Sequence, residues 1–361
     1  MKTVILAGGG HTHLEVLKRL SSHHDASVKW ILVSASRYHY YSGMFSGFAE
    51  GLYSIEDIRI DLKQLCEKKR IHFIEAAVES FDPEHQTVTL SDGEQLALAY
   101  DRLSLDIGSH TAPEQIEGLA ERQTQMKPAH LFPDRIEACR KAKELVIIGG
   151  GAAACEMAFS FHQWKQQHGR KYDRITVIAS NEFIDRKSDQ VIESMFEEKG
   201  IHFIKNDYAV KVTDRYVLTQ NEKNILYQEV IFLGGAQAPK LLEASGLPVD
   251  QKGFMKVNAG LQTIDDSSIF AAGDCVALVT HPDLPKSGVY AVRQGEVLYH
   301  NLLASLNREP LADYTPQQRA LILLSTGGME ALMLYGNWRK AGRWAWMWKD
   351  YIDRGYMRKY Q

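Results

Sequence analysis

The chain has 361 residues, 45% of them hydrophobic and 24% charged, which is the composition of a globular protein long enough for two or three domains. Its formal net charge of −3 gives no electrostatic reason to expect a nucleic-acid partner. No apolar run is long enough to span a bilayer, and the first one ends in glycines after a short strand, unlike a signal peptide. The four cysteines are widely spaced and never form a CxxC pair, so we expect a reducing, cytoplasmic environment and no metal site.

A glycine-rich turn follows the first predicted strand. Residues 3–7 are aliphatic and β-branched, as in a strand buried in a parallel sheet, and a helix is expected after Gly10. Gly8 permits a tight turn, Gly10 lets a diphosphate approach the backbone, and His11 is placed to contact phosphate. His13 stands where a third glycine is usual, so helix and strand are expected to pack less closely. The turn predicts a dinucleotide cradle, with an ordinary strand-to-helix turn as the alternative.

The next predicted strand, residues 28–33, ends at Ser34, where such cradles usually carry an acid that binds ribose. Ser34 and the nearby Arg37 can bind ribose or phosphate, but less specifically. An aromatic loop at 38–44 follows at the carboxyl edge of the expected sheet, where it either binds a ligand or simply packs.

A further strand of the same sheet is expected before a polar segment of the chain begins. Residues 103–107 read as a strand that ends in a turn at Gly108, and the polar, proline-containing segment 111–128 is the expected linker. Short strands are also expected before this point, at residues 71–74, 76–81 and 87–90.

A second glycine fingerprint follows about one domain length after the first. Residues 144–148 predict a buried strand, and Gly149 and Gly151 stand in the turn behind it. Here the third small residue is present as Ala154, at the start of the next helix. The recurrence of the pattern makes dinucleotide binding a stronger prediction than either turn makes alone.

The next strand of this second unit, residues 175–179, is followed by Ser180 and Asn181, where an acid would favour NAD. Arg186 and Lys187 either meet a ribose phosphate or are solvated surface charges. The choice between NADH and NADPH therefore stays open.

Two later strands also end in glycine turns. Residues 230–233 lead to Gly234, and residues 268–271 lead to Gly273 and the carboxylate of Asp274. A long helix is expected to begin at Lys286. A hairpin made of residues 321–324 and 331–335 completes the predicted elements.

The two fingerprints and the Gly273–Asp274 strand end resemble the pyridine nucleotide-disulfide oxidoreductase superfamily. Within it, the chain is similar to type II NADH dehydrogenases, and more so to the flavoproteins found alone or fused to selenide, water dikinase. The segments that carry this closer resemblance are residues 8–13, 41–44, 286–295 and 348–354.

The resemblance implies an α/β fold with two Rossmann-like domains, the second inserted in the first, and a small C-terminal region. It places the FAD-binding domain at 1–110 and 250–310, the NAD(P)H-binding domain at 111–249, and a hairpin with an aromatic tail at 311–361. The residues expected to bind FAD and NADH or NADPH are Gly8, Gly10, His11, Ser34, Arg37, Ser42, Val78, Gly108, Gly149, Gly151, Ala154, Gly234, Gly273, Asp274, Gly288 and Val289.

Three residues are the expected catalytic groups. Glu156 matches an acid that binds the carboxamide of the nicotinamide, although it could instead be a first-turn acid that favours the helix dipole. Lys286 matches the segment beside the flavin pyrimidine ring, with a solvated charge as the alternative. Tyr290 belongs to the same segment and is interpreted as flavin packing rather than as a proton donor.

The expected reaction is hydride transfer from NAD(P)H to the flavin, and then electron transfer to a quinone or another small acceptor. Residues 41–51 contain no cysteine, whereas disulfide reductases of the superfamily carry a redox cysteine pair beside the flavin. One alternative is a sulfide:quinone reductase using Cys139 and Cys155. The other is a non-catalytic flavin-binding accessory or sensor module, suggested by the weakened ribose positions Ser34 and Ser180.

The tail is rich in tryptophan and basic residues. This composition suits peripheral contact with the inner face of the cell membrane, which is how type II NADH dehydrogenases attach. Trp344, Trp346 and Trp348 alternate at strand spacing, however, which favours an aromatic lid over the flavin or a homodimer contact.

Overall fold

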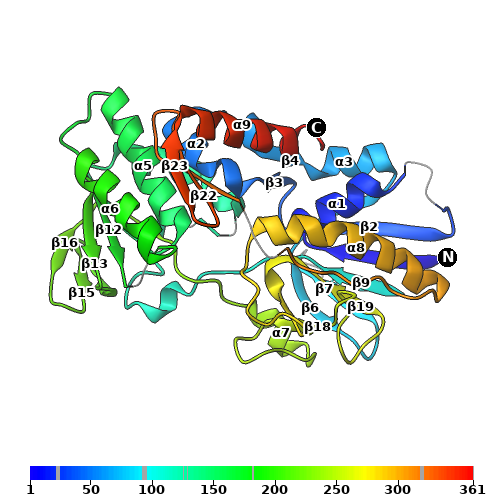
Figure 1. The fold of residues 1–361 in the computed structure, drawn as a ribbon. Helices are drawn as coiled ribbons and strands as arrows, with labels where there is room; N and C mark the ends of the chain where they lie inside the picture. The colour runs from blue at the N-terminus through cyan, green and yellow to red at the C-terminus, as the bar shows by residue number, and fades with distance from the viewer. Residues whose placement is uncertain are drawn as a thin grey trace.

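The computed structural model describes residues 1–21, 25–91, 96–124, 126–127, 129–180, 183–317 and 321–360. Two parallel sheets form the centres of its two halves. In Figure 1 the first runs from blue to cyan, with its last strand in yellow, and the second is mainly green. Buried aliphatic and aromatic side chains from both halves belong to one large apolar core. The protein therefore has the α/β layering that alternating strands and helices favour.

The first sheet has five parallel strands in the order β19-β9-β1-β2-β5. The strands, in this order, are Ile269–Ala271, Arg102–Leu105, Lys2–Ala7, Val28–Ser34 and His72–Glu75. Val4 to Ala7 are fully buried, as expected for a strand covered on both faces. Helices α1 (His11–Arg19) and α8 (Gly288–Asn307) lie side by side against this sheet (Figure 1).

The second sheet is also parallel and has the order β10-β17-β11-β12-β13. Its strands are Gln123–Thr124, Glu229–Phe232, Glu144–Ile148, Arg174–Ala179 and His202–Lys205. Helices α5 (Ala152–Gln167) and α6 (Arg186–Lys199) follow β11 and β12. All of these strands fall between β9 and β19 in the chain, so the second Rossmann-like unit is inserted in the first, as the sequence predicted.

Smaller elements complete the two halves. Each half carries an antiparallel three-stranded sheet, β6-β7-β8 (Val78–Asp82, Thr87–Leu90, Ala97–Ala99) and β14-β15-β16 (Ala209–Val212, Tyr216–Thr219, Asn224–Leu226). Two-stranded sheets are β3-β4 (Tyr38–Tyr40, Arg59–Asp61) and β18-β20 (Met255–Val257, Val276–Leu278). The short helices are α2 (Phe45–Glu50), α3 (Leu62–Lys69), α4 (Ile136–Lys141) and α7 (Lys240–Ala244).

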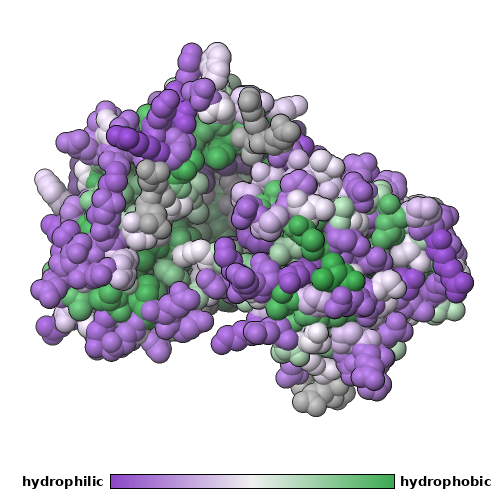
Figure 2. All heavy atoms as spheres, turned by 60° about the horizontal axis from the view of Figure 1, so that its bottom comes forward, coloured by the Kyte–Doolittle hydropathy of each residue, from purple (hydrophilic) through white to green (hydrophobic). Residues whose placement is uncertain are grey.

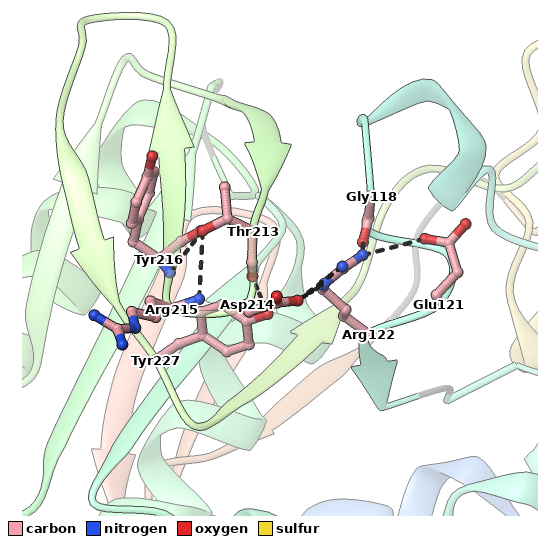
Figure 3. A network of polar contacts seen from close by, with 8 residues as sticks. All are labelled: Gly118, Glu121, Arg122, Thr213, Asp214, Arg215, Tyr216 and Tyr227. Carbon is pink, nitrogen blue, oxygen red and sulfur yellow. Dashed lines mark hydrogen bonds and ion pairs between the residues drawn. The ribbon is translucent and has the colours of Figure 1, made fainter.

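The prediction of a plain linker at 111–128 is wrong over β10, because Gln123 and Thr124 pair with the open edge of β17. Figure 3 shows how the preceding residues are held: Arg122 binds Asp214 at 2.8 Å and the carbonyl of Gly118 at 3.0 Å. The segment is therefore tied to the β14-β15-β16 sheet. Pro128 lies outside the described residues.

The predicted C-terminal hairpin is confirmed as β21 (Ile322–Ser325) and β22 (Ala331–Tyr335), to which β23 (Trp338–Gly342) adds a third strand. The strand-like alternation expected for the three tryptophans is wrong, because they lie in helix α9 (Arg343–Met357). Ala345, Lys349 and Asp353 recur every four residues on its buried side, so packing of that face selects the helix. In Figure 1, α9 (red) extends from the hairpin toward α1 and α3. Among the described helices, none combines the length and apolarity needed to cross a membrane.

Lys165 provides a test of how the second half is held together. Its side chain is 2% exposed, and its ammonium group binds the carbonyls of Arg140 and Ala142 and lies 3.3 Å from Asp173. We expect Lys165→Ala to lower the free energy of unfolding by about 3 kcal/mol, because it leaves the carbonyls of Arg140 and Ala142 without their donor and removes one of the two cations that bind Asp173. Chemical denaturation measures this. The exposed Lys171→Ala is the control, and equal effects of the two substitutions would contradict the interpretation.

Candidate functional site

The first glycine turn packs against the end of β9 so closely that side chains are excluded. Gly8 has a φ of +100°, and a Cβ there would lie 2.3 Å from the carbonyl oxygen of Asp106. A Cβ on Gly10 would lie 2.4 Å from the Asp106 carboxyl group. Helix α1 begins at His11 without a side-chain cap from Gly10. A glycine turn opening a helix in this way suits the diphosphate of a dinucleotide.

His13 does not obstruct this turn. Its Nδ1 lies 2.6 Å from the carbonyl oxygen of Gly8, and its Nε2 lies 2.8 Å from Oγ of Ser104 in β9. Burial lowers the pKa of His13 to about 4, so the ring is neutral. The imidazole thus fills the space between helix and strand that a third glycine would otherwise close.

Two further glycine turns meet the first one. Gly273, with a φ of +74°, follows β19, and a Cβ there would lie 2.5 Å from Oδ1 of Asp106. Gly288 begins α8, and a Cβ there would lie 3.4 Å from Nε2 of His11. Three of the residues predicted to bind FAD, Gly10, Gly273 and Gly288, are therefore brought together around Asp106 and His11.

His39 supplies an unused polar atom at the same place. Its Nδ1 lies 2.7 Å from the carbonyl oxygen of Gly9, so this nitrogen is the donor and Nε2 is an acceptor. Nε2 is buried and has no hydrogen-bond partner within the described part of the chain. Its ring packs edge-on to His11 at 4.7 Å. A hydroxyl of a bound FAD would satisfy this acceptor, so the residues present fit the cofactor.

The other residues predicted to bind FAD line the carboxyl edge of the first sheet. Ser34 ends β2, Val78 begins β6, and Ser42 lies in the aromatic loop, in the short turn Ser42–Met44 after β3. Arg37 is already engaged, because its guanidinium binds the Asp61 carboxylate at 2.6–3.1 Å. Its interaction with a phosphate would have to compete with that ion pair.

Asp274 is contacted by Ser109 and by Lys127, which lies in the inserted segment. Its carboxylate lies 3.3 Å from the hydroxyl of Ser109 and 3.4 Å from Nζ of Lys127. Gly108, which precedes Ser109, has a φ of +70° and open space where a Cβ would point. Together these residues place a partly neutralised carboxylate beside the first cradle.

The second cradle is more open. A Cβ on Gly149 would lie 2.5 Å from the carbonyl oxygen of Leu233, whereas a Cβ on Gly151 would meet nothing within 4 Å. Ala154 is fully buried in α5, and Gly234 follows the end of β17 against the Phe232 ring. The arrangement leaves free backbone approach at Gly151, as an incoming nucleotide requires.

The residues considered for the choice between NADH and NADPH follow β12 and begin α6. Ser180 lies exposed after β12, and Asn181 lies outside the described residues. Arg186 and Lys187 are exposed at the start of α6, next to the carboxylate of Asp185.

Glu156 connects parts of the chain that are far apart in sequence. It extends from α5, and its Oε1 accepts from the amide of Ser325 at 2.9 Å and lies 3.4 Å from the hydroxyl of Ser46 in α2. Burial raises the pKa of Glu156, and the nearby Lys349 ammonium partly opposes this. The carboxylate thus lies where the second fingerprint, the aromatic-loop region and the C-terminal hairpin meet. The alternative of a plain first-turn acid does not account for these contacts.

A buried ion pair lies close to Glu156. Lys349 of α9 binds Asp353 at 2.7 Å and the carbonyl of Gly43 at 2.6 Å, and Asp353 also accepts from the hydroxyl of Tyr41 at 3.0 Å. The surrounding carboxylates raise the pKa of Lys349 despite its burial, so it stays charged. The tail is therefore anchored to the loop that follows β3. Sequence reasoning named neither Lys349 nor Asp353 as a site residue, although both lie in a matching tail segment.

Lys286 is not a solvated charge. Its Nζ donates to the carbonyl of Val276 and lies 4.2 Å from the centre of the Phe254 ring, and burial lowers its pKa. It shares a small pocket with Asp274 and Tyr290. Val289, one residue before Tyr290, is 43% exposed.

The four cysteines are free and fully buried. Cys139 lies 3.6 Å from the hydroxyl of Thr124, and burial raises its pKa to about 12. Cys155 lies inside α5, and its pKa is also raised. Thiols of this kind are poor nucleophiles, because the thiolate is the reactive form.

The comparisons with known proteins agree with this geometry. Sulfide-quinone reductase of Aquifex aeolicus (strain VF5) is 25% identical over 99% of this chain and 91% of its own length. A solved structure of the sulfide:quinone oxidoreductase from Aquifex aeolicus superposes with a TM-score of 0.82 at 21% identity, over 99% of this chain and 91% of that one. Type II NADH:quinone oxidoreductase of Staphylococcus saprophyticus is 23% identical over 98% and 94%. A structure of NDH2 from Plasmodium falciparum in complex with NADH has a TM-score of 0.81 at 14% identity, covering 99% and 97%.

The family model described as pyridine nucleotide-disulphide oxidoreductase matches residues 2–295, a span that includes both glycine fingerprints and the Gly273–Asp274 strand end. The chain therefore belongs to the pyridine nucleotide-disulphide oxidoreductase family, and it is a flavoprotein oxidoreductase that uses FAD and NAD(P)H.

Proposed function

We propose that this protein transfers electrons from NAD(P)H, through FAD, directly to a quinone-type acceptor. The observation that carries the proposal is the junction at Glu156, which joins the second fingerprint helix to the aromatic-loop region and the C-terminal hairpin. The thiol next to it in α5, Cys155, is fully buried and has a raised pKa, so it is not placed to react. FAD supplies hydride acceptance and electron release when bound. In this proposal, residues 1–110 and 250–310 bind FAD, residues 111–249 bind NAD(P)H, and residues 311–361 form the tail.

The chain's own residues would bind and orient the reactants. Gly10 and Gly273 let the first turn pack against Asp106 and so shape the cradle for FAD, whereas Gly151 leaves open space for NAD(P)H. Glu156 is placed to orient the carboxamide of the nicotinamide. Its raised pKa also lets it hold a proton at a higher pH than a free glutamate. The charged Lys349 would limit that shift and stabilise negative charge nearby.

The sulfide:quinone alternative is motivated by the similarity to the Aquifex aeolicus enzyme. It requires reactive cysteines beside the flavin. Burial and the raised pKa values of Cys139 and Cys155 argue against that role.

Helix α9 suits an acceptor dissolved in a membrane. Its outer face exposes large apolar side chains at helical spacing: Trp344, Met347, Trp348, Tyr351 and Ile352. Exposed basic residues flank this face, namely Lys340, Arg343, Arg358 and Lys359. Such a helix can lie in a bilayer interface, attracted by anionic lipids. Figure 2 shows a further feature of the surface, a hollow with apolar (green) residues along it.

Rapid mixing tests the central reaction. We expect the visible absorbance of the oxidised flavin to bleach with NADH or NADPH and to return when a soluble quinone is added, with turnover of about 1 per second or faster. A flavin that bleaches with neither nucleotide would overturn the proposal. Bleaching without quinone turnover would favour the sensor alternative.

The same assay separates the sulfide alternative through a variant carrying Cys139→Ala and Cys155→Ala, with Cys66→Ala as the control. We expect NAD(P)H-dependent quinone reduction to stay within about twofold of the wild type, because buried thiols act as packing groups. Sulfide-dependent quinone reduction that disappears only in the double variant would instead support the alternative.

Gly151→Ala tests the second cradle. The added methyl group meets nothing within 4 Å in the protein, so we expect little change in melting temperature or FAD content. The dissociation constant for NAD(P)H should rise at least about tenfold, because the methyl group occupies the approach to the backbone. Titration of flavin reduction measures this. An unchanged dissociation constant would place the nucleotide elsewhere.

Vesicle sedimentation tests the role of α9. We expect the protein to sediment with anionic vesicles at low salt, and Trp344→Ser with Trp348→Ser to weaken this at least about tenfold by removing apolar contact. The fully exposed Tyr172→Ser in the other half is the control. If the double variant instead abolishes self-association in analytical ultracentrifugation, without any vesicle binding by the wild type, the face is a dimer contact.

A further inference from the structure

Asp106 lies between the glycine turns that form the first cradle. It follows β9 and is 4% exposed. Its Oδ2 accepts from the backbone amide of His13 at 2.9 Å, and the amide of Thr12 also binds the carboxyl group. The side chain therefore lies directly beneath the first turn of α1.

The two glycines that face the Asp106 carboxyl, Gly10 and Gly273, are among those expected to bind FAD. Added Cβ atoms on Gly10 and Gly273 would lie 2.4 and 2.5 Å from the carboxyl group. A diphosphate that approaches these glycines must come close to the Asp106 carboxyl. Two negative groups brought together in a buried place repel each other, unless one of them takes up a proton.

The surroundings offer Asp106 little positive charge beyond the amides of Thr12 and His13, which lower its pKa but are outweighed by burial. The titratable groups that influence it or lie around it are His11, His13, Lys127, Asp274, Cys275 and Tyr356. His11 and His13 are neutral at pH 7, because burial lowers each pKa to about 4. Lys127 is directed at Asp274, at 3.4 Å. No ion pair to Asp106 occurs among the described residues.

We propose that Asp106 is a protonated positioning residue for FAD, whose neutral carboxyl both caps the first turn of α1 and tolerates the diphosphate beside it. A protonated carboxyl keeps acceptor oxygens for the helix amides and adds an O–H donor that a carboxylate lacks. The inference rests on FAD binding at this cradle and is independent of the electron acceptor.

The proposal implies that FAD binding and proton uptake are linked. Burial already raises the pKa of Asp106 to about 7, and the negative diphosphate would raise it further in the loaded protein. Below about pH 7 the carboxyl is protonated with or without FAD, so affinity should not depend on this group. Above about pH 7, loading must first add a proton, so affinity should fall by up to about tenfold for each pH unit.

Asp106→Asn tests this, because asparagine is neutral, of similar shape, and keeps both an acceptor and a donor. FAD is fluorescent when released, so its dissociation from diluted holoprotein can be followed without any turnover. We expect the wild type to lose affinity between about pH 7 and pH 9, and Asp106→Asn to show a flat profile close to the wild-type value at about pH 6.

Asp189→Asn is the matched control. Asp189 is also buried and also accepts from two backbone amides, those of Phe183 and Ile184, but it lies in the second half of the molecule. Its substitution should preserve the wild-type pH profile. A slope that persists in Asp106→Asn, or loss of FAD from this variant at about pH 6 while it remains folded, would overturn the proposal.

A measurement on the wild type covers the case in which Asp106→Asn does not fold. Titration calorimetry of the full FAD-free chain with FAD, at about pH 8 in two buffers of different ionisation enthalpy, counts the protons taken up on binding. We expect uptake approaching about one proton per FAD. Binding without proton uptake would show that Asp106 stays ionised beside the cofactor, which contradicts the proposal.

Discussion

The structure depends on the contact between the first glycine turn and the end of β9. Because Gly8 and Gly10 have no side chains, the backbone of β9 and the carboxyl of Asp106 can lie directly against the start of α1. A Cβ at either position would overlap with atoms 2.3–2.4 Å away. This close packing orients the α1 N-terminus toward the turns at Gly273 and Gly288, and the three turns together form the cradle.

The cradle contains two buried polar groups that the described residues satisfy only in part. Among the described residues, Nε2 of His39 has no hydrogen-bond partner, and the Asp106 carboxyl accepts from backbone amides but forms no ion pair. Burying such groups costs free energy unless they are hydrogen-bonded or neutralised. A bound dinucleotide with hydroxyls and a diphosphate would supply partners for the first and would favour a proton on the second. Binding of the dinucleotide would therefore stabilise the structure around His39 and Asp106.

The insertion of the second sheet gives the protein its second functional junction. Glu156 follows the second glycine turn, yet its hydrogen-bond partners come from α2 and from the C-terminal hairpin. Lys349 and Asp353 continue the same buried polar region into α9, whose opposite face is apolar and exposed. A helix that contacts the aromatic loop on one side and exposes tryptophans on the other would bring a membrane-dissolved acceptor close to the flavin.

The sequence by itself determined the two glycine turns, the strands before them and the order of the two Rossmann-like units, because these features depend on local rules about backbone freedom and on the period of buried residues. The predicted hairpin of the tail was right for the same reason. The helix of the tail was not predicted, since its three tryptophans alternate and only packing of Ala345, Lys349 and Asp353 selects the helix. Only the tertiary structure decided the roles of Asp106, His39 and Lys349. Each acts through a partner more than 25 residues away in the chain, and no local pattern records which distant groups a buried charge will meet.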